Sequence, residues 1–400
     1  MNLCIAGKNN IAVEILYFAI NIFRKDNIFI ILNKSDNLKN TWQKSLGFFA
    51  KKEGLKIVEL EDIYHFNDLI FLSIEFDRII DPNKFNSTNL YNIHFSLLPE
   101  YKGVYTSLLP ILHGRNKTGV TLHKIDSGID TGGIIDQREI KINDDTSCRS
   151  LYFQLMNAGI ELIKNNFNYL ASNTVSIRIQ GSKGSTYYSR KCLDFNLKEI
   201  NPFQTAFQIQ RNVNAFIFRE YQMPIYNGKE IKRVEITDRR SNFKPGTIIY
   251  NDNEKIEIAT IDFNVVFFQD YYRNLVNCAR INDVIQLEKI IGYIDDINEI
   301  EENGWTPLMI ACFNGSADVV KVLIEHGADV NGTNLNGTSP IMYAKEYTLS
   351  KGDFSCLKLL LENGATLNTL DIYNRTVFDY LDKVENAELY NYLANHNYYD

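Results

Sequence analysis

The feature that most constrains the fold is a stretch that repeats itself in the last part of the chain. The segment GWTPLMIACFNGSADVVKVLIEHGADVN at residues 304–331 returns as GTSPIMYAKEYTLSKGDFSCLKLLLENGATLN at residues 337–368, a spacing of 33 residues. A degraded third copy spans residues 374–393, and residues 274–298 precede the set as a cap-like unit. A fixed period of this size is typical of stacked repeats, in which each unit buries its apolar face against its neighbours. We therefore expect three to four stacked helix pairs.

The repeat resembles the ankyrin signature in its TPLMIA line at residues 306–311 and its VVKVLIEHGADVN line at residues 319–331. The resemblance implies an all-α ankyrin repeat domain, which we place at residues 267–400, and a surface that binds a protein. Trp305 precedes the Thr-Pro pair at a position that we expect to be exposed. An exposed Trp could anchor a protein or stack on a planar ligand such as a second nucleotide. The alternative is that Trp305 packs on a neighbouring turn or on the catalytic domain.

The amino-terminal part alternates short apolar runs with helix-like patterns. The runs are rich in β-branched residues and lie at residues 2–6, 28–32, 55–59, 69–74 and 91–95. Strands that alternate with helices predict an α/β fold with a Rossmann-like parallel sheet, whose sites lie at the carboxyl ends of its strands. A helix over residues 147–170 closes this predicted catalytic domain, which we assign to residues 1–180.

A different pattern follows over residues 181–266, where one helical stretch at residues 203–216 precedes several Gly- or Asn-separated strand candidates. We expect a small mixed α+β second domain that serves the substrate or dimerisation. Residues 181–250 hold 12 Lys or Arg against 6 Asp or Glu, whereas residues 270–400 hold 9 against 20. A basic middle favours an anionic small molecule over RNA as its partner, and an acidic tail repels nucleic acid.

Several function classes receive no support from the sequence. Its apolar runs fall short of the roughly 20 residues that a spanning helix needs, so we expect no membrane partner. The start MNLCIAGKNN leads straight into a strand-like segment, without a basic region and an apolar stretch. The six cysteines are scattered, without the spacing of a disulfide scaffold or zinc site, so we expect a cytoplasmic protein without a metal.

Three polar residues stand at the ends of apolar runs in NIHFSLLPEYKG, residues 92–103, and KIDSGIDTGG, residues 124–133. Asn92 could donate to a developing oxyanion, His94 could donate or exchange a proton, and Asp130 could hold the imidazole or take a proton. Neither a GxSxG nucleophile motif nor a GxxxxGK[ST] phosphate loop occurs. The sequence therefore favours direct transfer to an external acceptor.

These two stretches together resemble the signature of the folate-dependent formyltransferases. The resemblance covers residues 1 to about 260 and implies 10-formyltetrahydrofolate as the formyl donor. It places the catalytic trio on Asn92, His94 and Asp130, with protonated His94 and Asn92 stabilising the oxyanion and Asp130 keeping His94 charged and helping to deprotonate the amine. The folate-binding candidates are Phe76, Leu97, Leu98, Ser127, Gly128 and Ile129.

The stretches AGKNNIAV and FLSIEFDRII most resemble the sugar N-formyltransferase branch. This branch implies a dTDP-linked amino-dideoxyhexose as acceptor, with its amine at C-3 or C-4, and a role in surface polysaccharide (O-antigen) synthesis by a homodimer. A nucleotide sugar offers a base for aromatic stacking and a diphosphate for cations. The substrate-binding candidates are Lys8, Asn9, Asn10, Arg190, Phe195, Arg219 and Tyr221. The alternatives are a methionyl-tRNA formyltransferase and a non-catalytic ankyrin adaptor.

Overall fold

The structure is a computed structural model that describes residues 1–396. The chain forms two compact units, one of Met1–Lys39 with Lys44–Gln269 and one of Asn40–Gln43 with the residues from Asp270 onward. The last four residues of the predicted ankyrin segment lie outside the described residues.

The first unit is built on a seven-stranded sheet. Its order is β3 (Lys56–Ile57), β2 (Ile28–Leu32), β1 (Asn2–Gly7), β4 (Leu69–Ile74), β5 (Asn89–His94), β7 (Lys117–Lys124) and β8 (Ile134–Lys141). The first five strands are parallel, and β7 and β8 extend the sheet antiparallel. The predicted α/β fold with a parallel sheet is confirmed. The expected strand at residues 55–59 is only two residues long because it lies on the exposed edge of the sheet.

Helices cover both faces of this sheet. On one face α1 (Asn9–Ile20) and α5 (Cys148–Ser172) pack together, with α2 (Leu46–Lys52) beside α1. On the other face α3 (Leu60–Ile63) packs on Cys4 and Ala6 of β1. A strand covered on both sides reads as a continuous apolar run, which explains the sequence NLCIAG of β1.

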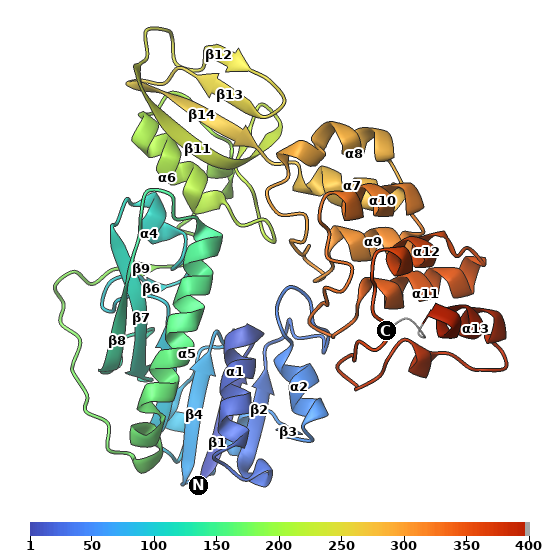
Figure 1. Ribbon diagram of the computed structural model, residues 1–400. Coiled ribbons are helices and arrows are strands. Elements are labelled where there is room, and N and C mark those ends of the chain that lie inside the picture. The colour runs from blue at the N-terminus through green and yellow to red at the C-terminus, as the bar shows by residue number, and fades with distance from the viewer. Residues whose placement is uncertain (397–400) are drawn as a thin grey trace. The chain divides into compact units, whose positions relative to one another are not determined.

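The small subdomain of this unit is an antiparallel five-stranded sheet with one helix. Its order is β10 (Ile225–Tyr226), β11 (Lys229–Arg240), β14 (Phe263–Gln269), β13 (Lys255–Ile258) and β12 (Ile248–Asn251). Helix α6 (Ala206–Phe216) buries Ile209 and Val213 against this sheet (Figure 1). The predicted mixed α+β architecture is confirmed.

Residues just after position 181 return to the larger sheet domain instead of joining the small sheet. There β9 (Tyr187–Tyr188) pairs with β6 (Lys102–Gly103), near the short helix α4 (Leu109–Leu112). The Tyr188 ring stacks on Tyr101, with ring centroids 5.4 Å apart. This return brings aromatic side chains next to the end of β5.

The second unit consists of stacked helix pairs, which confirms the ankyrin prediction. They are α7 (Tyr272–Ile281) with α8 (Val284–Ile290), α9 (Pro307–Asn314) with α10 (Ala317–Glu325), α11 (Pro340–Lys351) with α12 (Ser355–Glu362), and α13 (Ala387–His396) after a 3-10 turn at Phe378–Tyr380. Thr306 caps α9 through its side chain, Pro307 takes the first helical position, and Gly315 ends the helix at φ +70°. These positions explain the TP and NG letters of the repeat.

Trp305 is less exposed than the sequence predicts. It is half-buried, and its ring centroid lies 4.4 Å from that of Tyr343 and 5.2 Å from that of Phe313. The same unit includes residues 40–43, where the Trp42 amide donates to the Glu302 carbonyl at 3.3 Å. The turn that carries Trp305 is therefore packed by aromatic neighbours and does not project freely.

Candidate active site

Neighbouring strands and one turn bring the predicted trio together. Asn92 and His94 stand two residues apart near the end of β5, so both side chains point to the same side of the sheet. Asp130 lies in the turn between β7 and β8 with φ +55°, a conformation that Asp tolerates better than most residues. The Gln180 amide donates to the carbonyls of Asp130 and Gly132 at 2.9 and 2.7 Å and fixes this turn.

The Asp130 carboxylate lies within contact distance of both the Asn92 and the His94 side chains. Asp130 Oδ2 lies 3.6 Å from His94 Nδ1, and Asn92 Nδ2 donates to Asp130 Oδ1 at 3.5 Å. The Gly103 amide donates to Asp130 Oδ2 at 2.8 Å. On the other side of the ring, His94 Nε2 lies 2.8 Å from the Tyr101 carbonyl and therefore carries the hydrogen of that bond. In the neutral ring, Nδ1 is consequently the free base that faces Asp130.

Burial sets the charge state of the trio. It lowers the pKa of His94 below its ordinary value, and the nearby Asp130 charge opposes this shift only in part. Burial alone would raise the pKa of Asp130, but the nearby His94 and His123 rings and the hydrogen bond from the Gly103 amide outweigh it and lower that pKa to about 2. The lowered pKa of His94 favours a neutral imidazole beside an ionised Asp130 at neutral pH, whereas the family resemblance implies a protonated His94. Asp130 is therefore ionised at neutral pH and can stabilise a proton that His94 takes up.

His123 also lines this site, although no role was expected for it from the sequence. Its strand β7 pairs with β5 so that His123 stands opposite Asn92. His123 Nδ1 lies 2.7 Å from the Lys124 carbonyl, and Nε2 lies 3.0 Å from Asn92 Nδ2 and 3.6 Å from Asp130 Oδ1. Because Nδ1 must donate to the carbonyl, the neutral ring accepts from the Asn92 amide and fixes which way that amide points. The HKIDSG spacing alone carried no sign of this pairing.

The trio lies in the wall of a cavity of about 920 Å³. One part of the wall is apolar and includes Ile79 and Ile129, which are 80% and 40% exposed. Another part is aromatic and includes Tyr187 and Phe195. Large exposed apolar side chains in a concave wall are typical of a ligand site.

The predicted binding residues divide into two groups. Those that line the cavity are Lys8, Phe76, Gly128, Ile129, Arg190, Phe195 and Tyr221. Those that do not line it are Asn9, Asn10, Leu97, Leu98, Ser127 and Arg219. Leu98 is only 3% exposed because its side chain is part of the core, and the Asn10 side chain accepts from the Lys44 amide at 2.7 Å.

The sequence also gave no role to several other residues that line the cavity. Glu75 and Tyr152 lie on its wall, joined by a hydrogen bond of 3.0 Å. Tyr187 and Tyr188 reach it through the β6–β9 pairing. Glu75 follows β4 directly, so the rule that sites lie at carboxyl ends of parallel strands was the one signal that pointed to it.

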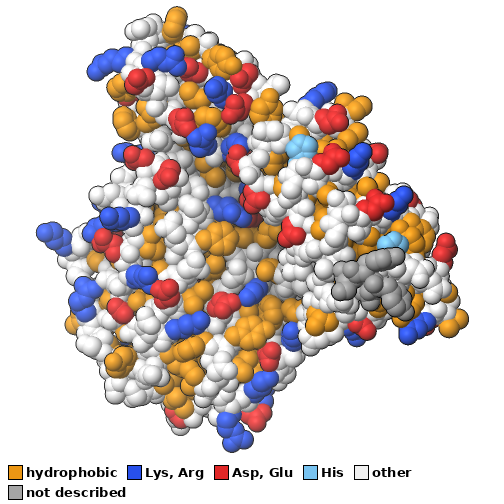
Figure 2. Space-filling model, viewed as in Figure 1, with side chains coloured by type: hydrophobic (Ala, Val, Ile, Leu, Met, Phe, Trp, Pro, Cys, Tyr) orange, Lys and Arg blue, Asp and Glu red, His pale blue; other side chains and the backbone are white. Residues whose placement is uncertain are grey.

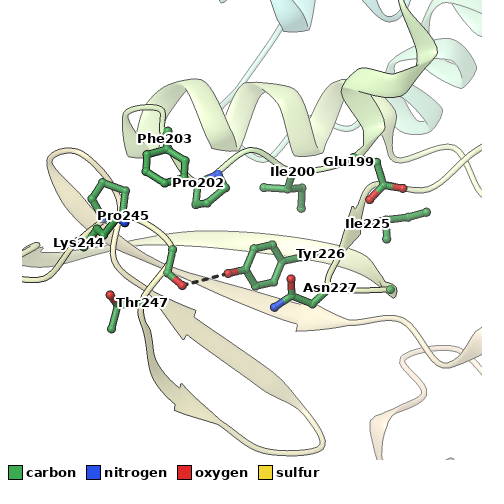
Figure 3. A pocket seen from close by; sticks show the side chains of 12 residues that line it. Glu199, Ile200, Pro202, Phe203, Ile225, Tyr226, Asn227, Lys244, Pro245 and Thr247 are labelled. Atoms are coloured by element: carbon green, nitrogen blue, oxygen red, sulfur yellow. Dashed lines mark hydrogen bonds between the residues drawn. The ribbon is translucent and has the colours of Figure 1, made fainter.

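A second hollow, of about 610 Å³, lies in the small subdomain (Figure 3). Its wall includes Phe203, Tyr226 and Lys244, and the Tyr226 hydroxyl donates to the Gly246 carbonyl at 3.5 Å. None of the trio residues lies there, so the chemistry belongs to the larger cavity.

Residues 1–396 contain neither a candidate metal cluster nor a helix that could span a membrane. No cluster of three or more His, Cys, Asp or Glu side chains in that range has the arrangement of a metal site. Within the same range, no helix combines the length and the apolar character needed to cross a bilayer.

Comparison with known proteins decides the family. Residues 66–165 match the formyl transferase family model, and residues 275–371 match the model for ankyrin repeats in three copies. A solved sugar 3N-formyl transferase, WlaRD, is 41% identical, with a TM-score of 0.63, over 67% of this chain and 97% of its own. The chain belongs to the formyltransferase family.

Other members of the formyltransferase family are also similar. The N-formyltransferase from Helicobacter canadensis is 40% identical over 68% of this chain and 100% of its own, with a TM-score of 0.63. The methionyl-tRNA formyltransferase of Ureaplasma parvum serovar 3 is 38% identical over 190 residues, or 47% of this chain. The match spans only 60% of that relative's length.

Proposed function

We propose that the cavity transfers a formyl group from 10-formyltetrahydrofolate to the C-3 amine of a dTDP-linked 3-amino-dideoxyhexose. The observation that carries the proposal is the convergence of Asn92, His94 and Asp130 on the wall of one cavity. WlaRD was solved with dTDP and 5-N-formyl-THF, and the Helicobacter canadensis protein with folinic acid and dTDP-3-aminofucose. The match extends over nearly the whole length of both relatives, which supports the assignment to the sugar branch.

The cavity has surfaces that suit both molecules. Its apolar part around Phe76, Ile79 and Ile129 fits the flat rings of a folate, which would supply the formyl carbon. Its aromatic part around Phe195 and Tyr221 can stack on a nucleotide base, and Lys8 and Arg190 can bind the diphosphate. These assignments support a site that holds both substrates at once.

The trio can manage charge and protons during the transfer. Asn92 can donate to the formyl oxygen as that oxygen becomes negative, replacing its long 3.5 Å contact with Asp130. His94 Nδ1 can accept the proton that the attacking amine releases when the new C–N bond forms. Ionised Asp130 then stabilises the imidazolium at 3.6 Å. The same proton can return to the departing nitrogen when the old C–N bond breaks.

The assay that tests the proposal uses purified protein, 10-formyltetrahydrofolate and dTDP-linked 3-amino and 4-amino sugars. We expect one formyl group to be added to the 3-amino sugar, with transfer lowered about 100-fold or more in His94→Asn. The matched control is His65→Asn, because His65 is exposed on the surface and does not line the cavity. Transfer to the 4-amino sugar alone would move the formylated amine from C-3 to C-4, and transfer to neither sugar would refute the proposal.

The same proposal includes the expected homodimer, the cytoplasmic location and the O-antigen role. The five buried cysteines and the exposed Cys192 are all free thiols, which is consistent with a reducing compartment. Sedimentation of the purified protein tests the dimer.

The methionyl-tRNA alternative is supported by the 38% identity to the Ureaplasma relative and is tested below through tRNA competition.

A further inference from the structure

A second polar cluster reaches the wall of the same cavity through Glu75 and Tyr152 and plays no part in the chemistry described above. We call it the Glu75 cluster; it consists of Glu75, Asn9 and Tyr152. Glu75 Oε2 accepts from Asn9 Nδ2 at 3.1 Å and from the Tyr152 hydroxyl at 3.0 Å, and Asn9 Nδ2 also lies 3.0 Å from that hydroxyl. The carboxylate is therefore held in one orientation.

Only one of the two carboxylate oxygens is occupied. Both hydrogen bonds go to Oε2, and within residues 1–396 no group donates to Oε1. The main chain of Glu75 is held as well, because Asn33 Nδ2 donates to its carbonyl at 2.9 Å and its φ is +52°. A non-glycine residue in this conformation costs energy and is held there by its surroundings, and such residues concentrate at functional sites.

The surroundings of Glu75 favour a neutral donor at Oε1. Burial raises the pKa of Glu75, while the Lys8 charge and the bonds from Tyr152 and Asn9 lower it in part. Glu75 is half-buried in the cavity wall and, within the described part of the chain, its Oε1 accepts no hydrogen bond, so a donor from a bound ligand can satisfy this oxygen. Lys8 lines the cavity and already supplies a positive charge, so a second cation would be repelled. A hydroxyl satisfies the oxygen without that repulsion.

The register of the sheet brings this oxygen close to the catalytic trio. Ser73 pairs with Asn92 and Ile74 with Ile93, so Glu75 follows β4 where His94 ends β5. Neighbouring strands lie about 4.8 Å apart. A ligand with its amine at His94 would therefore present a group on an adjacent carbon to Glu75.

We propose that Glu75 Oε1 accepts a hydrogen bond from a hydroxyl on a carbon next to the amine-bearing carbon of the acceptor sugar. Glu75 is then a specificity-determining residue that selects vicinal amino alcohols. The inference rests on the proposed function and adds to it the feature of the sugar that is recognised beside the amine.

The experiment compares the parent dTDP-3-amino sugar with its 2-deoxy and 4-deoxy analogues, in the full-length wild type and in Glu75→Gln. In the wild type we expect kcat/KM to fall about 10- to 100-fold for one of the two analogues, because the hydrogen bond from the sugar hydroxyl to Glu75 Oε1 is lost. In Glu75→Gln, kcat/KM for the parent sugar should fall by a similar factor. The ratio of kcat/KM between the parent sugar and that analogue should then be below about 3-fold. Glu61→Gln, an exposed site on α3, makes the same chemical change away from the cavity and should keep the wild-type preference.

Tyr152→Phe provides an independent variant if Glu75→Gln does not fold. It removes one of the two hydrogen bonds that orient Oε2. We expect the ratio of kcat/KM between the parent sugar and the analogue to decrease, but by less than in Glu75→Gln. Equal losses for both analogues in wild type and both variants would overturn the inference while leaving the proposed function intact. No transfer to the parent sugar by the wild type would refute the proposed function, and this inference with it.

Discussion

At the scale of single residues, two contacts decide which ring nitrogen of His94 can act as a base. Nε2 is bound to the Tyr101 carbonyl, and Nδ1 faces Asp130. Because burial lowers the pKa of His94 from its ordinary 6.5, the free base is present at neutral pH and is lost as the pH falls through the lowered value. We expect an NMR titration of the His94 ring to have its midpoint below 6.5, with kcat falling over the same range.

The signal of His94 can be assigned by its loss in His94→Asn. A midpoint above pH 7 would mean that the imidazolium is the resting form, and Asn92 and His94 would then share the oxyanion role that the sequence predicts.

His123 is expected to act through Asn92. His123→Ala removes the acceptor at 3.0 Å from the Asn92 amide, so the amide is free to turn away from the formyl oxygen. We expect kcat to fall about 10- to 100-fold through loss of orientation, with the KM for the sugar nearly unchanged. His123→Gln, whose amide can still accept, should recover part of the rate. A change confined to KM would instead make His123 a binding residue.

The sequence predicted the trio because the family motif holds all three residues in register. His123 and Glu75 escaped prediction for a physical reason: their roles come from the pairing of β5 with β7 and with β4, which the order of letters does not reveal. The binding residues were predicted by type and region alone, and Asn9 shows the limit, since its amide is engaged by Glu75 and Tyr152 and it does not line the cavity.

At the scale of elements, periodicity and turn residues predicted the parallel strands and the ankyrin helices. The β7–β8 hairpin was not predicted, although its closing turn carries Asp130. The shape of this turn depends on Gly132, where an added Cβ would lie 1.8 Å from the Lys124 carbonyl oxygen.

Gly132→Ala should therefore displace the turn and, with it, Asp130. We expect formyl transfer to fall by about 100-fold, since small displacements of reacting groups have effects of this size. Thermal unfolding measured beside kcat/KM separates a local from a global effect. Gly181→Ala is the matched control, because a Cβ there meets nothing within 4 Å. Wild-type kinetics in Gly132→Ala would show that the turn does not position Asp130.

Trp305 tests the role of the ankyrin element. Its ring packs on Tyr343 and Phe313, and all three side chains remain partly or largely accessible. We expect Trp305→Ala to weaken the binding of a protein or a nucleotide sugar by about 10-fold while kcat stays within about 2-fold of wild type. Calorimetry with dTDP-sugars and steady-state kinetics together measure both. Unchanged affinity and kinetics would leave Trp305 as a packing residue.

At the scale of the whole molecule, the charge distribution distinguishes a nucleotide sugar from tRNA. Residues 270–400 hold 9 Lys or Arg against 20 Asp or Glu. On the visible face of the small subdomain, basic side chains are interspersed with acidic ones and do not form one patch (Figure 2). A protein that makes 6–10 phosphate contacts loses about 10³- to 10⁵-fold in affinity between 50 and 200 mM salt. A diphosphate offers far fewer contacts.

We therefore expect kcat/KM for the dTDP-sugar to change by less than about 10-fold over that salt range, because few phosphate charges are neutralised. We also expect excess methionyl-tRNA neither to accept a formyl group nor to slow transfer to the sugar. The tRNA assay is a strict test of the assignment, because the Ureaplasma methionyl-tRNA formyltransferase is 38% identical to this chain over the matched region. Formylation of methionyl-tRNA with a steep salt dependence would reverse the assignment. It would show that the negative charge of the repeats does not prevent tRNA from binding.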